Sequence, residues 1–364
     1  MAATESHLEF SLALHRTIGG SERNSCFSPY SVASALSLAA KAAHGATADE
    51  LAALLGNVGQ HTDLLKSAAK LAPETHREEP QLDVANTLWA WDELPLEDGF
   101  LADLASWPGA KVASAPFTTD PEAARGLINA DVDQTTHGLI PELLPPGSIY
   151  PDTVATLVNA LYLKAAWIHR FTEGATAPAD FHTPSGTRQV PTMHLNERVG
   201  YRAAQGWQVV QLPAAGGVQA IILLPDGDLA SAENALDAST LGGLLTGTRG
   251  QSVRLALPKL SLDVASPLKD VLKTLGVRTM FSHQADLSGL SRDSRLYVSD
   301  VLHQAVLRLD EEGFEGAAAT ALTMRLTSMA IDEPVTVTVD RPFLLLIRHA
   351  ASGAVYFLAR VVEP

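Results

Sequence analysis

The chain has 364 residues, 46% of them hydrophobic and 18% charged, which is enough for a large core in one big domain or two smaller ones. Its 41 acidic and 26 basic residues give a net charge of −15, and this argues against nucleic-acid binding because phosphate contacts need clustered Lys and Arg. Cys26 is the single cysteine, so an intramolecular disulfide is excluded and nothing implies an oxidising compartment.

The N-terminal residues lack the basic region and apolar run of a signal peptide, and no apolar run approaches the length of a membrane-spanning helix. We therefore expect no membrane association and a cytoplasmic location for the sequence as written. A processed N-terminus would leave no trace, so an extracellular location stays open.

The first part of the chain is predicted to be mainly helical. A helix is expected to begin at Pro29 after a capping Ser28. Thr47 and Glu50 have the spacing of a capping box that opens a helix ending at Gly56. The predicted helices cover residues 6–20, 29–43, 51–55, 97–106 and 121–134, and a strand is predicted over 82–91.

Strands dominate the rest of the chain, without a regular β–α–β alternation, which favours an α+β fold over a doubly wound one. No internal repeat or low-complexity linker is present, so one compact domain is the simplest organisation. Strands are predicted over residues 154–167, 208–224, 253–262, 297–309, 335–339, 343–348 and 354–362, with helices over 230–246 and 266–276.

The sequence offers no local catalytic motif. It contains no Gly-x-Ser-x-Gly, His-Glu-x-x-His, Walker loop or Gly-x-Gly-x-x-Gly, and a single cysteine excludes a zinc-finger frame and a Cys-x-x-Cys pair. The acidic triplet at 310–312 is a poor acid–base pair because neighbouring strand residues point to opposite faces. We expect no metal, no cofactor and no enzyme activity, although a triad need not be local in sequence.

Residues 314–327 alternate like a half-buried strand. The middle of the segment is rich in alanine, which disfavours a strand standing alone. Two interpretations stay open: a strand that could fit between two existing strands, and a linker or short helix. The small or apolar set is Phe314, Gly316, Ala318, Thr320, Leu322, Met324 and Leu326, and the alternate set is Glu315, Ala317, Ala319, Ala321, Thr323, Arg325 and Thr327.

A series of weak motifs runs along nearly the whole chain in a specific order. In that order and spacing the chain resembles the serpins, serine protease inhibitors that work by conformational change, and it is expected to be a member of the prokaryotic type. The motifs are Phe27–Ser31, Asn129–Val132, Thr136–Ile140, Leu157–Ala160, Leu163–Trp167 with Phe171, Leu257–Leu260, Ala285–Gly289, Val301–Val306, Arg341–Phe343 and Phe357–Val361.

The resemblance implies the α+β serpin fold as a single domain over residues 1–364. Three β-sheets and about eight or nine surrounding helices are expected, with an exposed reactive-centre loop at about 313–334. In serpins a protease cleaves this loop, whose N-terminal part then inserts as a new central strand of the main sheet while the acyl-linked protease is carried across and distorted.

The implied partner is a target serine protease of the chymotrypsin, elastase, trypsin or subtilisin type, held in a covalent acyl complex. A papain-like cysteine protease is a further target class. The protein itself is expected to be a monomer. The alternative is a non-inhibitory serpin that is cleaved as a plain substrate or acts as a binding, storage or chaperone-like protein.

The resemblance also assigns roles to individual residues. A polar cluster beneath the opening point of the sheet, the shutter, is expected from Ser28, Ser31, Asn159 and His303. An ion pair of Lys259 with Glu311 beside Trp167 is expected at the top of the sheet, the breach. The hinge is expected at Gly313, Phe314, Glu315, Gly316, Ala317, Ala318, Ala319 and Thr320.

The hinge departs from the family pattern at two positions. Phe314 stands where inhibitory serpins usually have Thr, Ser or Val, and Gly316 replaces a usual alanine. Glycine costs about 0.5–1 kcal/mol against alanine in extra chain entropy. Together the two residues are expected to slow insertion and to shift some cleavage toward simple substrate turnover.

The cleaved bond follows from counting along the loop. Counting forward from Gly313 places it at Thr327–Ser328, whereas counting back from Pro342 places it near Ile331, so the loop is longer than usual by four residues. The forward count is preferred because the inserted length must match the sheet. Neighbouring bonds stay open: Arg325 would attract a trypsin-like enzyme, and Met324, Leu326 or Met329 would suit chymotrypsin-like, elastase-like or subtilisin-like pockets.

Overall fold

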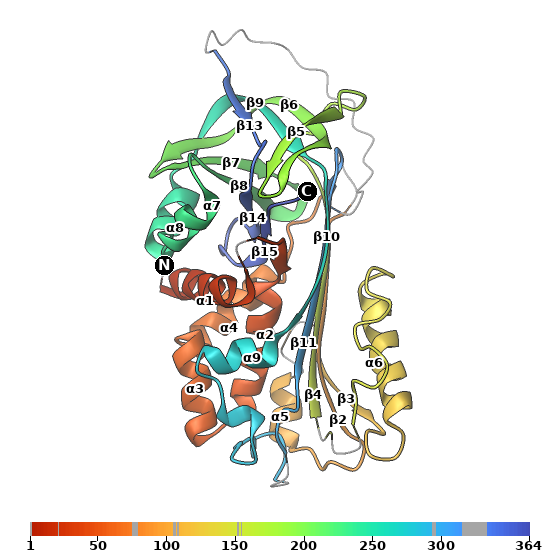
Figure 1. Ribbon diagram of the computed structural model, residues 1–364. Coiled ribbons are helices and arrows are strands. Elements are labelled where there is room, and N and C mark those ends of the chain that lie inside the picture. Colours follow the sequence, from red (N-terminus) through yellow and green to blue (C-terminus); the bar gives the residue numbers. More distant parts are fainter. Residues whose placement is uncertain are drawn as a thin grey trace.

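The computed structural model describes residues 2–20, 22–74, 79–104, 107, 109–150, 153, 155–292, 296–314 and 333–364. Helices come mainly from the N-terminal part and strands from the remainder, as an α+β fold requires (Figure 1). None of the helices in these ranges is both long and apolar enough to cross a bilayer.

Nine α-helices form among the described residues, within the expected number. Ser28 caps α2 by accepting a hydrogen bond from the Ser31 amide, and Pro29 follows as predicted. Gly56, at φ 72°, ends α3 as predicted. The helices are α1 (Ala2–Ile18), α2 (Pro29–Ala42), α3 (Gly45–Leu55), α4 (Val58–Ala68), α5 (Asp98–Leu104), α6 (Pro121–Thr135), α7 (Leu229–Asn234), α8 (Ala238–Thr246) and α9 (Leu268–Thr274).

The predicted capping box of α3 is wrong. The helix begins earlier, at Gly45, so Thr47 lies inside its first turn. Its hydroxyl accepts a hydrogen bond from the Asp286 amide at 3.0 Å. The Glu50 carboxylate accepts from the Thr279 amide at 2.8 Å, far along the chain. Both side chains therefore bind a distant segment, and tertiary contacts have replaced the local cap.

The described strands form two hydrogen-bonded sheets. The smaller has six strands in the order β10–β11–β12–β4–β2–β3, and the other nine strands form the larger one. The strands are β1 (Ser25–Phe27), β2 (Gln81–Trp91), β3 (Ala110–Ala115), β4 (Ala155–Ala166), β5 (Ala177–Thr183), β6 (Gly186–Ala204), β7 (Trp207–Pro213), β8 (Val218–Pro225), β9 (Arg249–Pro258), β10 (Leu260–Pro267), β11 (Val301–Leu309), β12 (Gly313–Phe314), β13 (Val335–Thr338), β14 (Phe343–His349) and β15 (Val355–Val361).

The larger sheet joins what sequence analysis expected as two separate sheets. The reason is β6, which has 19 residues and pairs with β5 near its start, with β7 near its end and with β9 in between. Hydrogen bonds therefore connect β1, β15, β14, β8 and β7 on one side of β6 with β9 and β13 on the other. The serpin-like architecture is present, with two hydrogen-bonded networks in place of three.

Several predicted elements are divided or were missed. The predicted strand 208–224 is two strands, because Gly216 and Gly217, both at φ 74°, turn the chain between β7 and β8. The predicted strand 253–262 is likewise β9 followed by β10, and the predicted helix 230–246 is α7 followed by α8. The missed elements are α4, β1, β3, β5 and β6, several of them short or largely exposed.

Two hydrophobic cores hold these layers together. The large one is formed by residues of both sheets and of several helices, and it includes the apolar residues of the buried strands β14 and β15. The small one lies between the six-stranded sheet and α6. Figure 1 shows α6 on one face of this sheet and α2, α5 and α9 on the other. The six-stranded sheet is therefore covered on both faces, and a strand that entered it would be buried.

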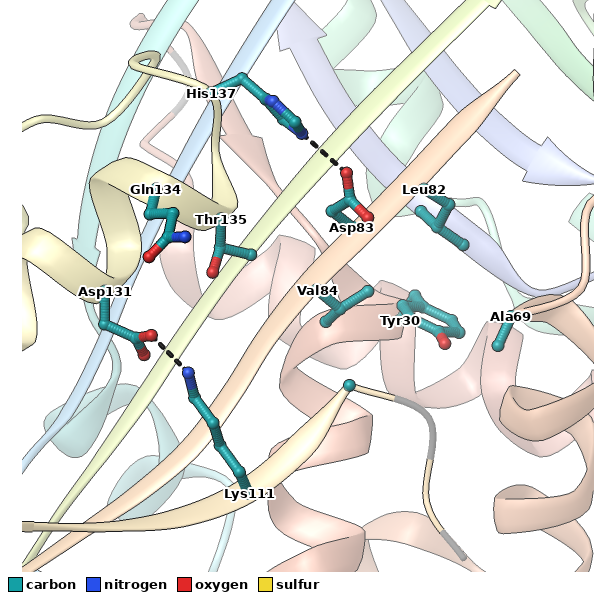
Figure 2. A pocket seen from close by; sticks show the side chains of 11 residues that line it. Tyr30, Ala69, Leu82, Asp83, Val84, Lys111, Asp131, Gln134, Thr135 and His137 are labelled. Atoms are coloured by element: carbon teal, nitrogen blue, oxygen red, sulfur yellow. Dashed lines mark hydrogen bonds and ion pairs between the residues drawn. The ribbon is translucent and has the colours of Figure 1, made fainter. Parts of the chain in front are cut away.

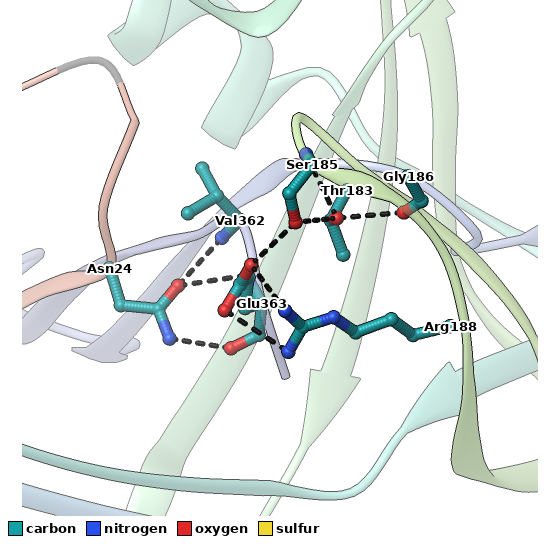
Figure 3. A network of polar contacts seen from close by, with 7 residues as sticks. All are labelled: Asn24, Thr183, Ser185, Gly186, Arg188, Val362 and Glu363. Atoms are coloured by element: carbon teal, nitrogen blue, oxygen red, sulfur yellow. Dashed lines mark hydrogen bonds and ion pairs between the residues drawn. The ribbon is translucent and has the colours of Figure 1, made fainter.

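The C-terminal end of the chain is fixed by Asn24 (Figure 3). The Asn24 side chain accepts from the Val362 and Glu363 amides at 2.8 and 3.0 Å and donates to the Glu363 carbonyl at 2.5 Å. The Glu363 carboxylate in turn lies 3.2 Å from the Ser185 hydroxyl and 3.5 Å from Arg188, in and beside the turn of the β5–β6 hairpin. Segments far apart in sequence thus hold the end of β15.

A buried histidine pair connects α1 with α4. The Val355 amide donates to His7 Nε2 at 2.9 Å, so His7 carries its proton on Nδ1 and donates to His61 Nε2 at 2.9 Å. His61 Nδ1 donates to the Leu55 carbonyl at 2.9 Å. Both rings are therefore neutral. Burial lowers the pKa of His7 to about 3 and also lowers that of His61.

We expect the free energy of unfolding to decrease as the pH falls from about 6.5 toward 3. An unfolded histidine titrates near pH 6.5, whereas folded His7 resists protonation down to about pH 3. Its stabilising contribution is therefore complete above pH 6.5 and is lost on acidification, by about 2 kcal/mol at pH 5. Urea unfolding at pH 7 and pH 5 measures the loss. His7→Asn should reduce it, and the exposed His194→Asn should not; equal losses in all three proteins would contradict the assignment.

Candidate functional site

The two central strands of the six-stranded sheet pair along only part of their length. Strands β11 and β4 are parallel and directly paired over Val301–Gln304 and Leu157–Ala160. Beyond this, toward the other end, no direct pairing between the two strands is recorded in the described ranges. The joint between β11 and β4 is therefore closed at one end only.

Strand β12 occupies the other end of this joint. Phe314 lies opposite Leu309 of β11 and opposite Ala165 of β4, antiparallel to both. The stretch between Phe314 and the directly paired residues, 305–308 on β11 and 161–164 on β4, is called the slot below. Strand β12 pairs with both neighbours at this end, so the edges of β11 and β4 face the same strand there.

A tight turn connects β11 to β12. The Asp310 amide donates to the Gly313 carbonyl at 3.1 Å, and the Asp310 side chain accepts from the Glu312 and Gly313 amides at 2.9 and 3.2 Å. A Cβ atom on Gly313 would lie 2.2 Å from the Ala165 carbonyl oxygen. Glycine is therefore required here by close approach to β4, in addition to the freedom expected of a hinge.

Phe314 is fully buried in the sheet in spite of its bulk. Its side chain is 1% exposed, and its ring centroid lies 4.6 Å from that of Trp167. The ring belongs to the large core, on the same face of the sheet as Leu161 and Leu163. The bulky residue that departs from the family pattern is thus accommodated by an aromatic contact.

The predicted ion pair at the breach is present. Lys259 Nζ lies 2.7 Å from Glu311 Oε2, and the Trp167 indole donates to the Asp310 carbonyl at 2.9 Å. Sequence analysis missed Thr176, whose hydroxyl donates to Glu311 Oε1 at 2.6 Å. Burial acts to raise the pKa of Glu311, but the hydrogen bonds from Lys259 and Thr176 outweigh it and leave the pKa lowered.

The predicted shutter residues also come together. The Ser28 amide donates to His303 Nε2 at 2.9 Å, so His303 is protonated on Nδ1, which donates to Asn159 Oδ1 at 3.1 Å. Asn159 Nδ2 donates to the Ser31 carbonyl at 2.8 Å. Burial lowers the pKa of His303 to about 4, which keeps the ring neutral.

Asn86 is a further member of the shutter that sequence analysis missed. Its side-chain oxygen accepts a hydrogen bond from Asn159 Nδ2, and its residue on β2 lies directly opposite Asn159 on β4. A side-chain amide within a largely apolar buried stretch of β2 is the signal that could have identified it. Ser31 takes part through its backbone carbonyl, since its hydroxyl has no hydrogen-bond partner among the described residues.

The remaining predicted site residues lie outside the described residues. They are the hinge positions Glu315, Gly316, Ala317, Ala318, Ala319 and Thr320 and the cleavage-site positions Met324, Arg325, Leu326, Thr327, Ser328 and Met329. Within the described part of the chain, no three His, Cys, Asp or Glu side chains are grouped as metal ligands.

Phe314→Ala should release β12 from the end of the slot. The substitution removes a buried ring, a loss that costs about 3–5 kcal/mol in a core. We expect a lower melting temperature and a red shift of tryptophan emission as Trp167 becomes wet, with no shift in a Trp167→Phe background. Phe314→Leu keeps most of the volume and is the matched control. Unchanged emission in Phe314→Ala would mean that the ring does not hold the strand.

Comparisons with known proteins agree with this geometry. The family model described as serpin (serine protease inhibitor) matches residues 5–364. The leukocyte elastase inhibitor of Bos taurus is 34% identical, with 100% of this chain and 99% of the relative covered. A serine protease inhibitor of Cyanea capillata is 31% identical, with 100% and 98% covered. A structure of thyroxine-binding globulin with thyroxine superposes with a TM-score of 0.87 at 27% identity, covering 100% of both chains. The chain belongs to the serpin family.

Proposed function

We propose that this serpin inhibits a serine protease as a suicide substrate. The protease cleaves the loop near Thr327–Ser328, and residues 314–327 then form a central strand that runs through the slot, separates the paired residues of β11 and β4 beyond it, and traps the acyl-enzyme. The observation that carries the proposal is the slot itself, closed at one end and held open at the other by Phe314. The first residue of the proposed inserting segment already occupies its place in the sheet.

The strands on either side of the slot support the same register. Strand β12 is antiparallel to both neighbours, so each step along the loop moves one residue back along β4 and along β11. Eight residues beyond Phe314, Leu322 would lie opposite Leu157 on one side and opposite Val301 on the other. One regular strand could therefore pair with both β4 and β11 without a bulge. The direct pairs between β4 and β11 would be broken.

The same register places Thr320 beside the shutter. It would lie opposite Asn159 on β4 and opposite His303 on β11, on the face that already receives Phe314. A hydroxyl can donate to or accept from these neutral groups, whereas an unpaired charge would cost several kcal/mol. Ordering the backbone costs about 1–2 kcal/mol per residue, and each ladder hydrogen bond returns about 0.5–1.5 kcal/mol. Because these two contributions nearly cancel, the side chains decide whether the free energy of insertion is favourable.

A serine protease is the partner class that the relatives favour. Two of them are named as inhibitors, of leukocyte elastase and of a serine protease. The fold also suits a chain that is cut, because β13, β14 and β15 follow the loop and are held by pairing and by Asn24. The downstream fragment would stay bound after cleavage.

The proposal is tested by incubation with trypsin, chymotrypsin, elastase and subtilisin. An adduct that survives denaturing electrophoresis is expected with at least one of them, and sequencing of the released peptide locates the bond. The cut protein should also melt at a higher temperature, because the uncut fold is held kinetically. Complete cleavage by the whole panel without any adduct would sink the proposal.

Thr320→Arg should convert the inhibitor into a substrate. The arginine would have to be buried between Asn159 and His303, so insertion slows and the protease completes hydrolysis. We expect at least a tenfold rise in the number of inhibitor molecules consumed per protease trapped, since burial costs well above 1.4 kcal/mol. Thr323→Arg, on the outward set, is the matched control and should leave this ratio nearly unchanged. Equal ratios in the two variants would show that the inward and outward faces are assigned wrongly.

A carrier of small organic anions is the second candidate function. A cavity of about 440 Å³ lies between α1, α8 and the turn after β14. Arg348 and Glu5 line it, and the burial of Arg348 lowers the pKa of its guanidinium. The structurally similar thyroxine-binding globulin was solved in complex with thyroxine. Anilinonaphthalene sulfonate should bind the parent and not Arg348→Met; equal affinity would remove this candidate.

A further inference from the structure

Three exposed arginines on β6 and β9 have no partner within the protein. They are Arg198 on β6, and Arg249 and Arg254 on β9. None of them makes an ion pair or a hydrogen bond in the part of the chain that the structure describes. The chain as a whole carries a net charge of −15, so carboxylates are abundant and three unpaired arginines on neighbouring strands are unexpected.

Basic side chains on the six-stranded sheet, by contrast, have carboxylate partners. Lys111 of β3 pairs with Asp131 of α6, and His137 Nε2 lies 2.8 Å from Asp83 Oδ2 of β2. Figure 2 shows these two pairs beside a cavity of about 510 Å³. The arginines of β6 and β9 therefore differ from these basic groups in being left free for an external partner.

The strand pairing places Arg198 and Arg254 close together on one face of the sheet. Arg254 is directly opposite Asn196, and Arg198 is directly opposite Ser252, so the two arginines are diagonal neighbours, about 7–8 Å apart. Both belong to the outward set of their strands. The alternate, inward residues are buried: Leu195, Val199, Val253 and Leu255. The exposed surface around Arg198 and Arg254 is called the arginine face below.

The acidic side chains close to these strands do not neutralise the arginine face. Glu197 lies in the inward set of β6, and its carboxylate is 4.0 Å from His169 Nδ1. Glu333, just before β13, makes no ion pair with either arginine. Like charges on adjacent strands lower the stability of a sheet. Contacts within the fold therefore give no reason for the two arginines.

The arginine face adjoins the strand that follows the loop. Strand β13 pairs with β9 and places Thr336 directly opposite Arg254. Figure 1 shows β6, β9 and β13 together at the top of the view. Adjacent strands lie about 4.7–4.9 Å apart. Arg254 is therefore one strand away from the point at which the loop rejoins the sheet.

The length of the loop keeps a bound protease near this face. Val335 begins β13, seven to ten residues after the candidate cleavage positions Arg325 to Ser328. Fully extended, such a segment spans at most about 25–35 Å. A protease of about 230 residues has a radius of gyration of about 17 Å, so its width is comparable with that span. Its surface is therefore held close to β13 and β9.

We propose that the arginine face is a docking surface for an acidic patch on the protease that cleaves the loop. This names the kind of partner and rests on the function proposed above. Guanidinium groups bind carboxylates through two parallel hydrogen bonds, and their combined positive field accelerates the encounter with an acidic surface. A protease with a basic patch at the same place is repelled, so the face selects among enzymes that cut the same bond.

Three double variants test the docking surface. Arg198→Gln with Arg254→Gln removes both charges of the face. Arg23→Gln with Lys41→Gln removes two charges from exposed, unpaired positions elsewhere and is the matched control. Arg198→Lys with Arg254→Lys keeps the charge. Melting temperatures should be equal in the parent and the first variant, because the arginines hold no contact of the fold.

The probes are an anionic and a cationic trypsin with the same cleavage specificity. The measurement is the second-order rate constant of loop cleavage at 50 and 500 mM NaCl, which is obtained whether or not the protease is trapped. With anionic trypsin at 50 mM NaCl, the first variant should be cleaved about three- to tenfold more slowly than the parent, the control and the lysine variant. The difference should disappear at 500 mM NaCl, because salt screens exposed charges. Cationic trypsin should cleave the first variant no more slowly than the parent.

An equal loss of rate in the control, an equal loss with cationic trypsin, or a difference that persists at 500 mM NaCl overturns the docking surface. Adducts that form at the same rate in the parent and the first variant overturn it as well and leave the inhibitory function standing. If cleavage depends on the arginine face but no protease of the panel is trapped, the inhibitory function is overturned and the docking surface stands.

Discussion

The architecture depends on one joint, where β11 and β4 share hydrogen bonds along part of their length and are held apart at the other end by Phe314. Backbone groups left unpaired inside a sheet cost free energy, so incomplete pairing of β11 with β4 lowers the stability of the folded state. The ring of Phe314 beside Trp167 offsets part of this cost by apolar burial. The turn at Asp310, the breach and the shutter all lie along this joint, and α6 packs against one face of the sheet that contains it.

The polar groups along the joint are charged where they are partly exposed and neutral where they are buried. At the breach, Lys259 is still 39% exposed, so a charged pair with Glu311 can be kept at small desolvation cost. At the shutter, His303 and Asn159 are fully buried, and the cluster there is made of neutral amides, a hydroxyl residue and a neutral imidazole. This gradient is what burial imposes, because an ion pair at shutter depth would lose more hydration than it regains. In the proposed register, the hydroxyl of Thr320 would meet these neutral groups at the level of the shutter.

Much of this arrangement could be predicted from sequence because it rests on motifs of fixed order. The spacing of Leu257–Leu260 and of residues 310–313 locates Lys259, Glu311 and Gly313 without a structure, and Ser28–Pro29 locates the start of α2. Contacts that depend on three-dimensional register could not be found this way. Thr176 reaches Glu311 across 135 residues, and Asn86 meets Asn159 only because β2 and β4 pair. The capping box at Thr47 failed for the same reason, since distant backbone groups compete for its side chains.

The anchoring of the C-terminal strands has a consequence for the molecular state of the protein. Strands β14 and β15 are buried along their whole length in the large core, and Asn24 fixes the chain end beyond them. A cut anywhere in residues 315–332 leaves this core intact but turns one polypeptide into two. The folded product is then a heterodimer whose smaller chain supplies β13, β14 and β15 of the larger sheet. Its unfolding becomes a dissociation, governed by mass action as well as by the contacts within the fold.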